Sequence, residues 1–259
     1  MRVVITGAAG LIGGIVHDHL SGLGHDVVGL DRPLEAWMLA GRNTEDDLAR
    51  SRVEVEMELS TAADEALAAV LEGADVLIPL AADADPSNED SSMLRNNIEV
   101  TTTLFRCARD SHVRRVIVAS SGLAQVGLEP LFEEGGPLHG RLIQIEDGIA
   151  PTSTYGASKI YAEVLAEMHA RVHGMETVAA RLGTVIPDES EHWRRGGRLQ
   201  ATALLAEDVR RFFEAALTAP LEAHLLTAVQ SDSPGRFLDL EPGLSVLDWS
   251  PIEWPSESF

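Results

Sequence analysis

Short apolar runs alternate along the chain with longer segments of helical periodicity. Runs rich in β-branched residues predict strands at 2–6, 26–30, 53–59, 75–80, 114–120, 176–182 and 223–230. Between them, apolar residues recur at helical spacing and predict helices at 11–24, 62–73, 93–110, 154–173 and 206–217, with a short helix starting at 238–240. Strands that alternate with helices indicate an α/β fold, a doubly wound parallel sheet with helices on both faces.

Two long stretches lack such periodicity, 122–152 and 184–202. Each follows a predicted strand, so both are expected at the carboxyl ends of the strands. Open α/β sheets bind their ligands at that edge. We therefore expect the functional site beside these two stretches.

Length and charge narrow the classes of function. A chain of 259 residues with 45% hydrophobic residues fits one large domain with a sizeable core. Its 41 acidic residues against 20 basic ones give a formal net charge of −21, which argues against nucleic acid or an anionic membrane as the main partner. No apolar run approaches the roughly 20 residues of a membrane span. The N-terminus has no long apolar segment before its glycines, and we expect a cytoplasmic protein.

Cysteine and histidine usage gives no sign of a metal site. Cys107 is the only cysteine, which excludes an intrachain disulfide and a cysteine-based zinc site. Its helical surroundings favour a buried structural thiol. His17 and His19 point to different sides of a predicted helix, where we expect them to be exposed. No metal is expected in the mechanism.

A glycine pattern follows the first predicted strand and opens the first helix. Gly7, Gly10 and Gly13 have the spacing G-x-x-G-x-x-G. The first glycine permits a tight turn, the second lets the backbone approach a pyrophosphate, and the third allows close packing of helix on strand. The helix N-terminus offers N–H donors to the phosphates. Glycines also serve plain turns, but the frame of strand, turn, helix and strand favours a dinucleotide.

Asp31 ends the second predicted strand, at the spacing expected for the acid that binds the adenosine ribose hydroxyls. A carboxylate there repels a 2′-phosphate, so the sequence favours NAD over NADP. The adjacent Arg32 weakens this preference. The alternative is that Asp31 merely begins a loop before Pro33.

Tyr155 and Lys159 lie one helical turn apart on the same face of a predicted helix. Lys159 is the only lysine among the 20 basic residues. A free tyrosine has a pKa of about 10, and acting as a base near neutrality requires a fall of about 3 units, or roughly 4 kcal/mol. One cation about 4 Å away, at an effective dielectric constant of 20, supplies about that much. A compact ammonium suits this task better than a guanidinium does. The alternative is a surface lysine on an amphipathic helix.

A hydroxyl partner is expected at the end of the fifth strand, from Ser120 or Ser121. Either could hydrogen-bond a substrate oxygen. Small polar residues at a strand end are also ordinary turn formers.

Several motifs together resemble the extended short-chain dehydrogenases/reductases, the NAD-dependent epimerase/dehydratase group. They are TGAAGLIGG (6–14), Asp31, PLAA (79–82), RNN (95–97), VASS (118–121), YGASK (155–159), ARLGTVIP (180–187) and LDWSP (247–251). The resemblance implies an NAD-binding Rossmann domain at 1–183. A small substrate-binding region at 184–259 would interleave with the end of the sheet.

The resemblance also assigns roles to individual residues. The implied catalytic residues are Ser121, Tyr155, Lys159 and Asn97. The implied cofactor-binding residues are Gly7, Gly10, Leu11, Ile12, Gly13, Asp31, Leu59, Leu80, Ala81, Ala82, Tyr155, Lys159 and Leu182. The implied substrate-binding residues are Ser120, Ser121, Gly122 and Arg198.

Among this group, the chain looks most similar to uronate dehydrogenases. It is short after Leu182, which suggests a small substrate rather than a nucleotide sugar. Arg198 lies ten residues before Asp208, where the resemblance implies an arginine that binds the substrate carboxylate. A solvated basic cluster is the alternative. Gly122 and Leu123 replace the family's Asn-His, and Ala84 replaces a substrate-contacting serine, so a different hydroxy acid, lactone or sugar is also open.

The resemblance implies an NAD-dependent oxidoreductase of carbohydrate metabolism that oxidises a hydroxyl of a small sugar acid or related polyol. Two alternatives stay open, a sugar or nucleotide-sugar epimerase or dehydratase, and a non-catalytic NAD-binding regulatory protein. The resemblance further implies a homodimer formed through helices 93–110 and 154–173.

Overall fold

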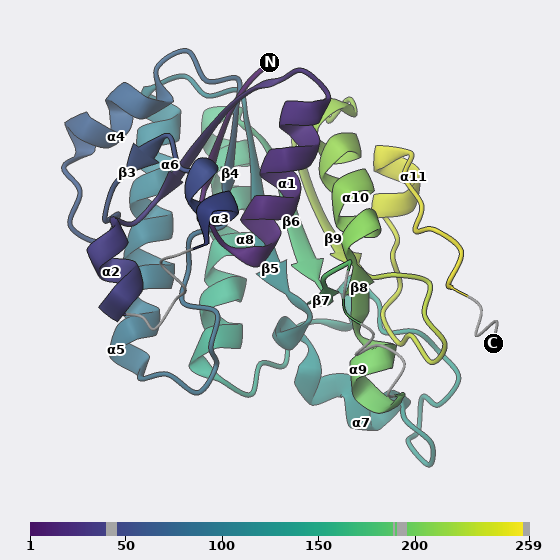
Figure 1. Cartoon of the computed structure of the whole chain (residues 1–259). Coiled ribbons are helices and arrows are strands. Elements are labelled where there is room, and N and C mark those ends of the chain that lie inside the picture. Colours follow the sequence, from purple (N-terminus) through teal and green to yellow (C-terminus); the bar gives the residue numbers. More distant parts are fainter. Residues whose placement is uncertain (40–45, 189, 191–195, 256–259) are drawn as a thin grey trace.

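A seven-stranded parallel sheet forms the centre of the computed structural model, which describes residues 1–39, 46–188, 190 and 196–255. The strands follow the order β3-β2-β1-β4-β5-β6-β9 (Figure 1). Their bounds are β1 Arg2–Thr6, β2 Asp26–Asp31, β3 Val55–Glu56, β4 Val76–Pro79, β5 Arg115–Ser121, β6 Glu176–Leu182 and β9 His224–Val229. The order reverses between β1 and β4, which makes a crevice at their carboxyl ends.

Helices cover both faces of the sheet because each strand is apolar on both sides. On one face, α1 (Leu11–Gly22), α10 (Ala206–Thr218) and α11 (Gly243–Leu247) share a core cluster with Val3 and Ile5. On the other, α4 (Asp64–Leu71), α6 (Val100–Asp110) and α8 (Thr154–His173) share a cluster with Val4. The predicted doubly wound parallel sheet is therefore confirmed.

Three elements differ from the sequence-based expectation. The strand expected at 53–59 shortens to the two residues of β3, which pair with Leu30 and Asp31 of β2 at the edge of the sheet. The helix expected at 93–110 divides into α5 (Asp90–Met93), a π-helix (Leu94–Glu99) and α6. Residues 238–240 form no helix; Leu238 makes a bridge with Ile143, and the helix begins later, at α11.

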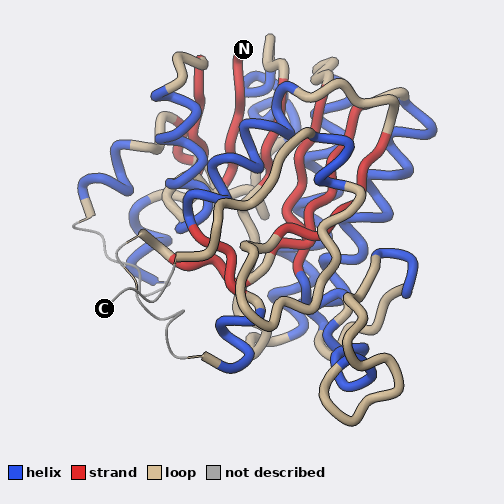
Figure 2. The backbone as a smooth tube through the Cα atoms, turned by 90° about the vertical axis from the view of Figure 1, so that its right-hand side faces the viewer, coloured by secondary structure: helices blue, strands red, loops and turns tan. Residues whose placement is uncertain are grey.

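The two irregular stretches carry short elements that periodicity did not predict (Figure 2). After β5 come three 3-10 turns (Gly122–Ala124, Val126–Leu128 and Ile145–Asp147) and α7 (Glu129–Phe132). After β6 come β7 (Thr184–Ile186), α9 (Gly197–Ala201) and β8 (Ala203–Leu205), with β7 and β8 paired in a parallel two-stranded sheet. Figure 1 shows α7 and α9 side by side below the carboxyl ends of the main strands. The other two helices are α2 (Leu34–Leu39) and α3 (Asp47–Ser51).

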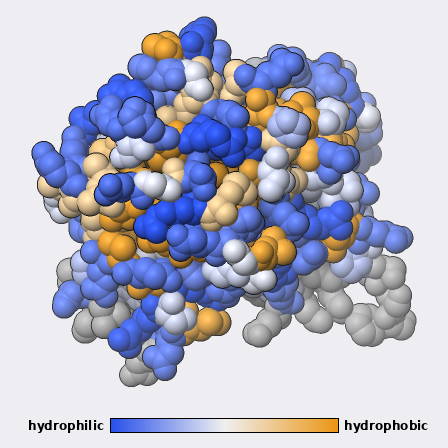
Figure 3. Space-filling view, turned by 90° about the horizontal axis from the view of Figure 1, so that it is seen from above, coloured by the Kyte–Doolittle hydropathy of each residue, from blue (hydrophilic) through white to orange (hydrophobic). Residues whose placement is uncertain are grey.

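The end of the molecule opposite to α7 and α9 is largely hydrophilic, with scattered apolar residues (Figure 3). None of the helices in the described part of the chain could span a membrane. Cys107 is buried, as predicted. The prediction of exposed histidines was wrong: the His17 ring is buried on α1 and lies 3.5 Å from Glu54, and His19 is partly buried and bonds Glu214 at 2.8 Å.

Candidate active site

The glycine turn between β1 and α1 has no room for a side chain at Gly7 or Gly13. Gly7 has φ +72°, which favours glycine, and a Cβ there would lie 2.8 Å from the Ala81 nitrogen. A Cβ on Gly13 would lie 2.1 Å from the Gly7 carbonyl oxygen. The turn therefore brings the start of α1 against the loop after β4. The N–H groups of the turn itself donate within the protein, so the donors suited to a dinucleotide pyrophosphate are those in the first turn of α1.

Asp31 stands beside this turn at the end of β2. Its buried carboxylate accepts hydrogen bonds from the backbone N–H of Ala9 at 3.0 Å and of Arg32 at 2.8 Å. The Arg32 side chain is directed to Glu58, with 3.9 Å between the charged atoms. A carboxylate fixed at this place suits ribose hydroxyls and repels a 2′-phosphate. The residues present therefore fit NAD.

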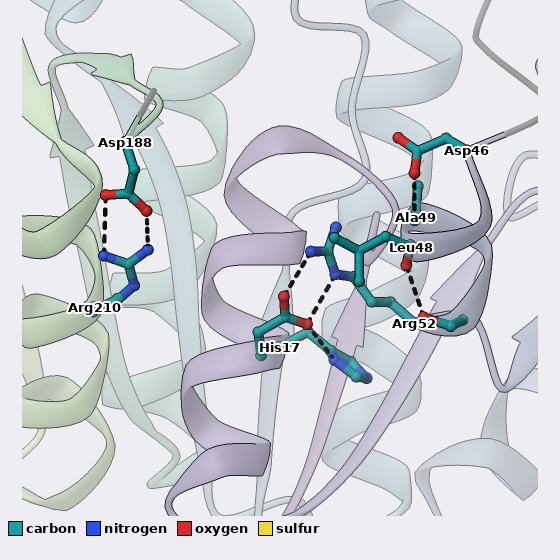
Figure 4. Close-up of polar contacts among 9 residues, drawn as sticks. His17, Asp46, Leu48, Ala49, Arg52, Asp188 and Arg210 are labelled. Atoms are coloured by element: carbon teal, nitrogen blue, oxygen red, sulfur yellow. Dashed lines mark hydrogen bonds and ion pairs between the residues drawn. The ribbon is translucent and has the colours of Figure 1, made fainter. Parts of the chain in front are cut away.

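A cavity of about 400 Å³ opens over the glycine turn and the first residues of α1. Two arginines line it, and both are paired. Arg52 holds Asp18 through two hydrogen bonds, and Arg210 holds Asp188 (Figure 4). Asp46 caps α3 by accepting from the Ala49 N–H at 2.9 Å. Among the described residues that line the cavity, contacts to phosphate therefore fall to backbone N–H groups at the start of α1, since both arginines are paired.

The N-terminus of α8 is fastened against the end of β5. Ser153 caps the helix by accepting from the Gly156 N–H at 3.1 Å. Gly156 has no side chain because a Cβ would lie 2.8 Å from the Leu123 carbonyl oxygen. This close approach places Tyr155 and Lys159 next to Ser121.

Tyr155, Lys159 and Ser121 meet at this edge of the sheet. Lys159 donates from Nζ to the Ala119 carbonyl oxygen at 3.2 Å and lies 5.5 Å from the centroid of the Tyr155 ring. Burial lowers the pKa of Lys159 to about 8. The Lys159 nitrogen thus lies over the face of the phenol ring and is hydrogen-bonded to the end of β5. Tyr161, which hydrogen-bonds Thr102 on α6 at 2.7 Å, serves packing as expected.

The shift in the pKa of Tyr155 is opposite to the sequence-based expectation. Burial, the largest cause, raises the pKa of the phenol; a hydrogen bond with Ser121 lowers it, and the charge of Asp83 raises it further. The sequence argument assumed a cation about 4 Å from the phenol. In the structure Lys159 turns its nitrogen to a backbone carbonyl instead, so the protein by itself keeps Tyr155 protonated at neutral pH.

Ser120 does not face the substrate edge. Its hydroxyl donates to Glu163 at 2.5 Å, and the residue is only 3% exposed. The predicted substrate contact at Ser120 is therefore unsupported, because neighbouring residues of a strand point to opposite faces. Ser121 takes the opposite direction, accepts from the Leu123 N–H at 3.2 Å and meets Tyr155.

Asn97 acts on the geometry of the site rather than on substrate. Its amide donates to the Asp83 carbonyl oxygen at 3.0 Å and to the Ser158 hydroxyl at 3.1 Å, and accepts from the Asp83 N–H at 2.8 Å. The side chain is buried within the π-helix. Asn97 therefore ties the loop after β4 to α8, so the structure indicates a positioning role.

Arg198 is already engaged by a carboxylate. It donates from Nε and Nη2 to the two oxygens of Glu129, at 2.9 and 2.7 Å. The expected role of Arg198 as a free carboxylate anchor is therefore not what the geometry presents. The arginines at 194 and 195 lie outside the described residues.

The other predicted site residues lie along the same edge. Ala81 donates its N–H to the Thr6 hydroxyl at 3.1 Å, which holds the PLAA loop beside the glycine turn. A Cβ on Gly122 would meet only Leu238 and Leu182 at ordinary distances of 3.6 and 3.8 Å. Leu11 is exposed, Leu182 is buried, and Ile12, Leu59, Leu80 and Ala82 are partly buried. Their contacts with a cofactor remain predictions.

Sequence reasoning missed three acidic residues near the site, Asp83, Glu129 and Glu163. Glu163 continues the stripe of Tyr155 and Lys159 one turn further, and Arg181 interrupts an apolar strand, which together could have signalled a buried pair. Glu129 gives no such signal, because its partner is distant in sequence.

Comparison with known proteins agrees with this geometry. The family model described as the NAD dependent epimerase/dehydratase family matches residues 3–217. The chain belongs to this family. NAD is accordingly its cofactor, and the prediction of an NAD-dependent enzyme of the short-chain dehydrogenase/reductase type is confirmed.

Individual members of the family differ in their reactions. The chain is 27% identical to NAD-dependent glucose-6-phosphate dehydrogenase of Haloferax volcanii, covering 98% of this chain and 94% of the relative. It is 25% identical to L-arabinose 1-dehydrogenase (NAD(P)(+)) of the same organism, covering 96% of each. A solved structure of a mutated uronate dehydrogenase superposes with a TM-score of 0.78 at 25% identity, covering 97% of this chain and 82% of that one. The predicted similarity to uronate dehydrogenases is thus confirmed.

Proposed function

We propose that this enzyme oxidises a hydroxyl group of a small sugar, sugar acid or related polyol, with NAD as the hydride acceptor. The observation that carries this proposal is the meeting of Tyr155, Lys159 and Ser121 at the edge that also holds the glycine turn. The similarity to dehydrogenases of sugars and uronates supports the substrate class.

Ser121, Tyr155 and Lys159 have separate roles in proton transfer. Ser121 orients the reacting hydroxyl, and Tyr155 removes its proton. Lys159 stabilises the phenolate with its positive charge and is suited to hold the nicotinamide ribose. NAD, when bound, supplies the hydride acceptor. Because burial raises the pKa of Tyr155, the oxidation rate should increase as the pH rises above neutrality, until Lys159 loses its charge near its pKa of about 8.

Removing the phenolic oxygen of Tyr155 tests the role of this residue. We expect Tyr155→Phe to reduce kcat by about a hundredfold to ten-thousandfold, the scale of general-base catalysis, while NADH still binds. The readout is NADH formation at 340 nm with a panel of aldoses and sugar acids, and NADH fluorescence for binding. Tyr161→Phe, on the same helix, is the control and should retain activity. Wild-type rates in Tyr155→Phe would refute the proposal.

The same assay separates the alternative reactions. An epimerase or dehydratase returns the hydride to its product and gives no net NADH. A regulatory NAD-binding protein gives no turnover of any substrate.

A further inference from the structure

The ion pair between Glu129 and Arg198 joins the two loops that border the site. Glu129 begins α7, in the loop after β5 and Ser121. Arg198 lies in α9, after β6 and β7. The paired atoms are 2.7 and 2.9 Å apart, which is the bidentate geometry of a strong arginine–carboxylate interaction. The pair thus occupies the carboxyl edge of the sheet, where ligands of this fold bind.

Glu129 prevents Arg198 from binding a second carboxylate. The Glu129 side chain is 9% exposed, whereas Arg198 is 50% exposed. If Arg198 turned to a substrate carboxylate, Glu129 would remain as a buried charge without its partner, which is costly. If Arg198 stayed paired with Glu129, the charge of that carboxylate would already balance its own. Its remaining N–H donors suit neutral hydroxyl groups.

The other charged groups beside the site also disfavour a carboxylate on the substrate. In the described part of 122–152 and 184–202, the only other arginine is Arg141, which pairs with Asp147 and lies over the Phe132 ring. Asp83 places a negative charge close enough to Tyr155 to raise the pKa of the phenol. Within the described residues of these two loops, a carboxylate on the substrate would meet these acids, and both arginines are already paired.

We propose that the enzyme takes an uncharged sugar or polyol rather than a sugar acid, and that Glu129 is the residue that determines this specificity. The inference rests on the proposed function and narrows its substrate class.

Pairs of substrates that differ only in the charged group test the inference. We would compare D-galactose with D-galacturonate and D-glucose with D-glucuronate, measuring kcat/KM with NAD at 340 nm. The wild type should favour the neutral sugar of each pair. Glu129→Gln frees the guanidinium and should shift the uronate-to-aldose ratio of kcat/KM toward the uronate by on the order of tenfold or more, the scale of a charged hydrogen bond.

Two further variants separate charge pairing from a general effect. Glu133→Gln removes an exposed acid that acts on Arg198 through charge alone, without a hydrogen bond, and should shift the ratio little. Adding Arg198→Met to Glu129→Gln should abolish the gain on uronates. Unchanged NADH binding and circular dichroism would show that the variants are folded.

The outcomes distinguish the two proposals. A wild type that prefers the uronates, or a Glu129→Gln ratio equal to that of the wild type, would overturn the role of Glu129 while leaving the dehydrogenase in place. Absence of NADH with every sugar would instead reject the proposed function. Calorimetric titration of the NADH-bound protein with galactose and galacturonate then decides the charge preference: tighter binding of galacturonate by the wild type than by Glu129→Gln overturns it, and the reverse supports it.

Discussion

At the scale of single residues, Lys159 combines a chemical role with a cost in stability. It is the only lysine of the chain, and it lies partly buried over the ring of Tyr155. Burial lowers its pKa to about 8 because the charged form loses hydration. Lys159 therefore carries its charge below about pH 8 and loses it above that pH.

Lys159→Met should therefore lose activity and gain stability. The folded pKa lies below the ordinary value of 10.5, so the unfolded chain binds the proton more tightly. The wild type is penalised fully below about pH 8, and the penalty fades as the pH rises toward the unfolded pKa. At pH 7 we expect Lys159→Met to be more stable by about 1–3 kcal/mol, since one pKa unit corresponds to about 1.4 kcal/mol.

Urea unfolding between pH 6 and pH 10 measures this difference. Arg171→Met is the control, because its side chain is 73% exposed on the same helix and should change little with pH. A stability gain that grew with pH, or none at all, would contradict the assignment of Lys159 as a buried cation.

At the scale of elements, the packing of α1 on β1 depends on a missing side chain. A Cβ on Gly13 would lie 2.1 Å from the Gly7 carbonyl oxygen, and Gly13 is buried in α1, which packs against the sheet. Gly22 ends the same helix with nothing within 4 Å of its would-be Cβ. The same substitution to alanine should therefore change the stability of the protein differently at the two glycines.

Gly13→Ala should destabilise the protein by about 3 kcal/mol, the upper range for overpacking, and weaken NADH binding because the turn shifts. Gly22→Ala should instead stabilise by about 0.5–1 kcal/mol, through the smaller entropy loss of alanine in a helix. Thermal unfolding and NADH fluorescence provide the readouts. Equal effects of the two substitutions would disprove the argument from close packing.

Helix α8 is also tied to β6 by a buried ion pair. Glu163 accepts two hydrogen bonds from Arg181, both at 2.8 Å, and one from Ser120. The side chains of the pair are 5% and 2% exposed. This pair fixes the helix that carries Tyr155 against the strands that end at the site.

Glu163→Gln should cost about 3 kcal/mol, since it leaves Arg181 as a buried charge without its counterion. The matched control is Glu167→Gln, one turn later on α8, where the ion pair is exposed and should contribute less than about 0.5 kcal/mol. Chemical denaturation measures both changes. A Glu163→Gln variant as stable as Glu167→Gln would show that the pair is not needed.

At the scale of the whole molecule, the net charge of −21 acts against the compact state. Many ion pairs are exposed, such as Arg106 with Asp64, and they offset only part of the repulsion. The surface is accordingly rich in hydrophilic residues (Figure 3). The predicted homodimer would add a second copy of this charge, and it remains a prediction.

Salt should stabilise the protein by screening this repulsion. The screening length falls from about 10 Å at 0.1 M salt to about 3 Å at 1 M. We expect the melting temperature to rise over that range by roughly 2–4 °C, corresponding to about 1 kcal/mol. The effect should shrink as the pH approaches the isoelectric point of about 4.7, where the net charge vanishes. A melting temperature that falls with salt at pH 7 would contradict it.

The sequence by itself determined the features that depend on local pattern. Periodicity predicted β1, β6 and α8 with their bounds, and spacing placed Gly7, Gly13, Asp31, Tyr155 and Lys159 at one site. These features could be predicted because each needs only a short stretch of chain with a fixed helical or strand geometry. The family follows from the same motifs in order.

Only the tertiary structure decided which charges meet. Glu129 and Arg198 are 69 residues apart, and no local pattern links them. The same holds for the burial of Ser120 on Glu163 and for the short elements after β5 and β6. The physical reason is that burial and pairing set the energy of a charge, and both depend on neighbours that the fold brings together from distant parts of the chain.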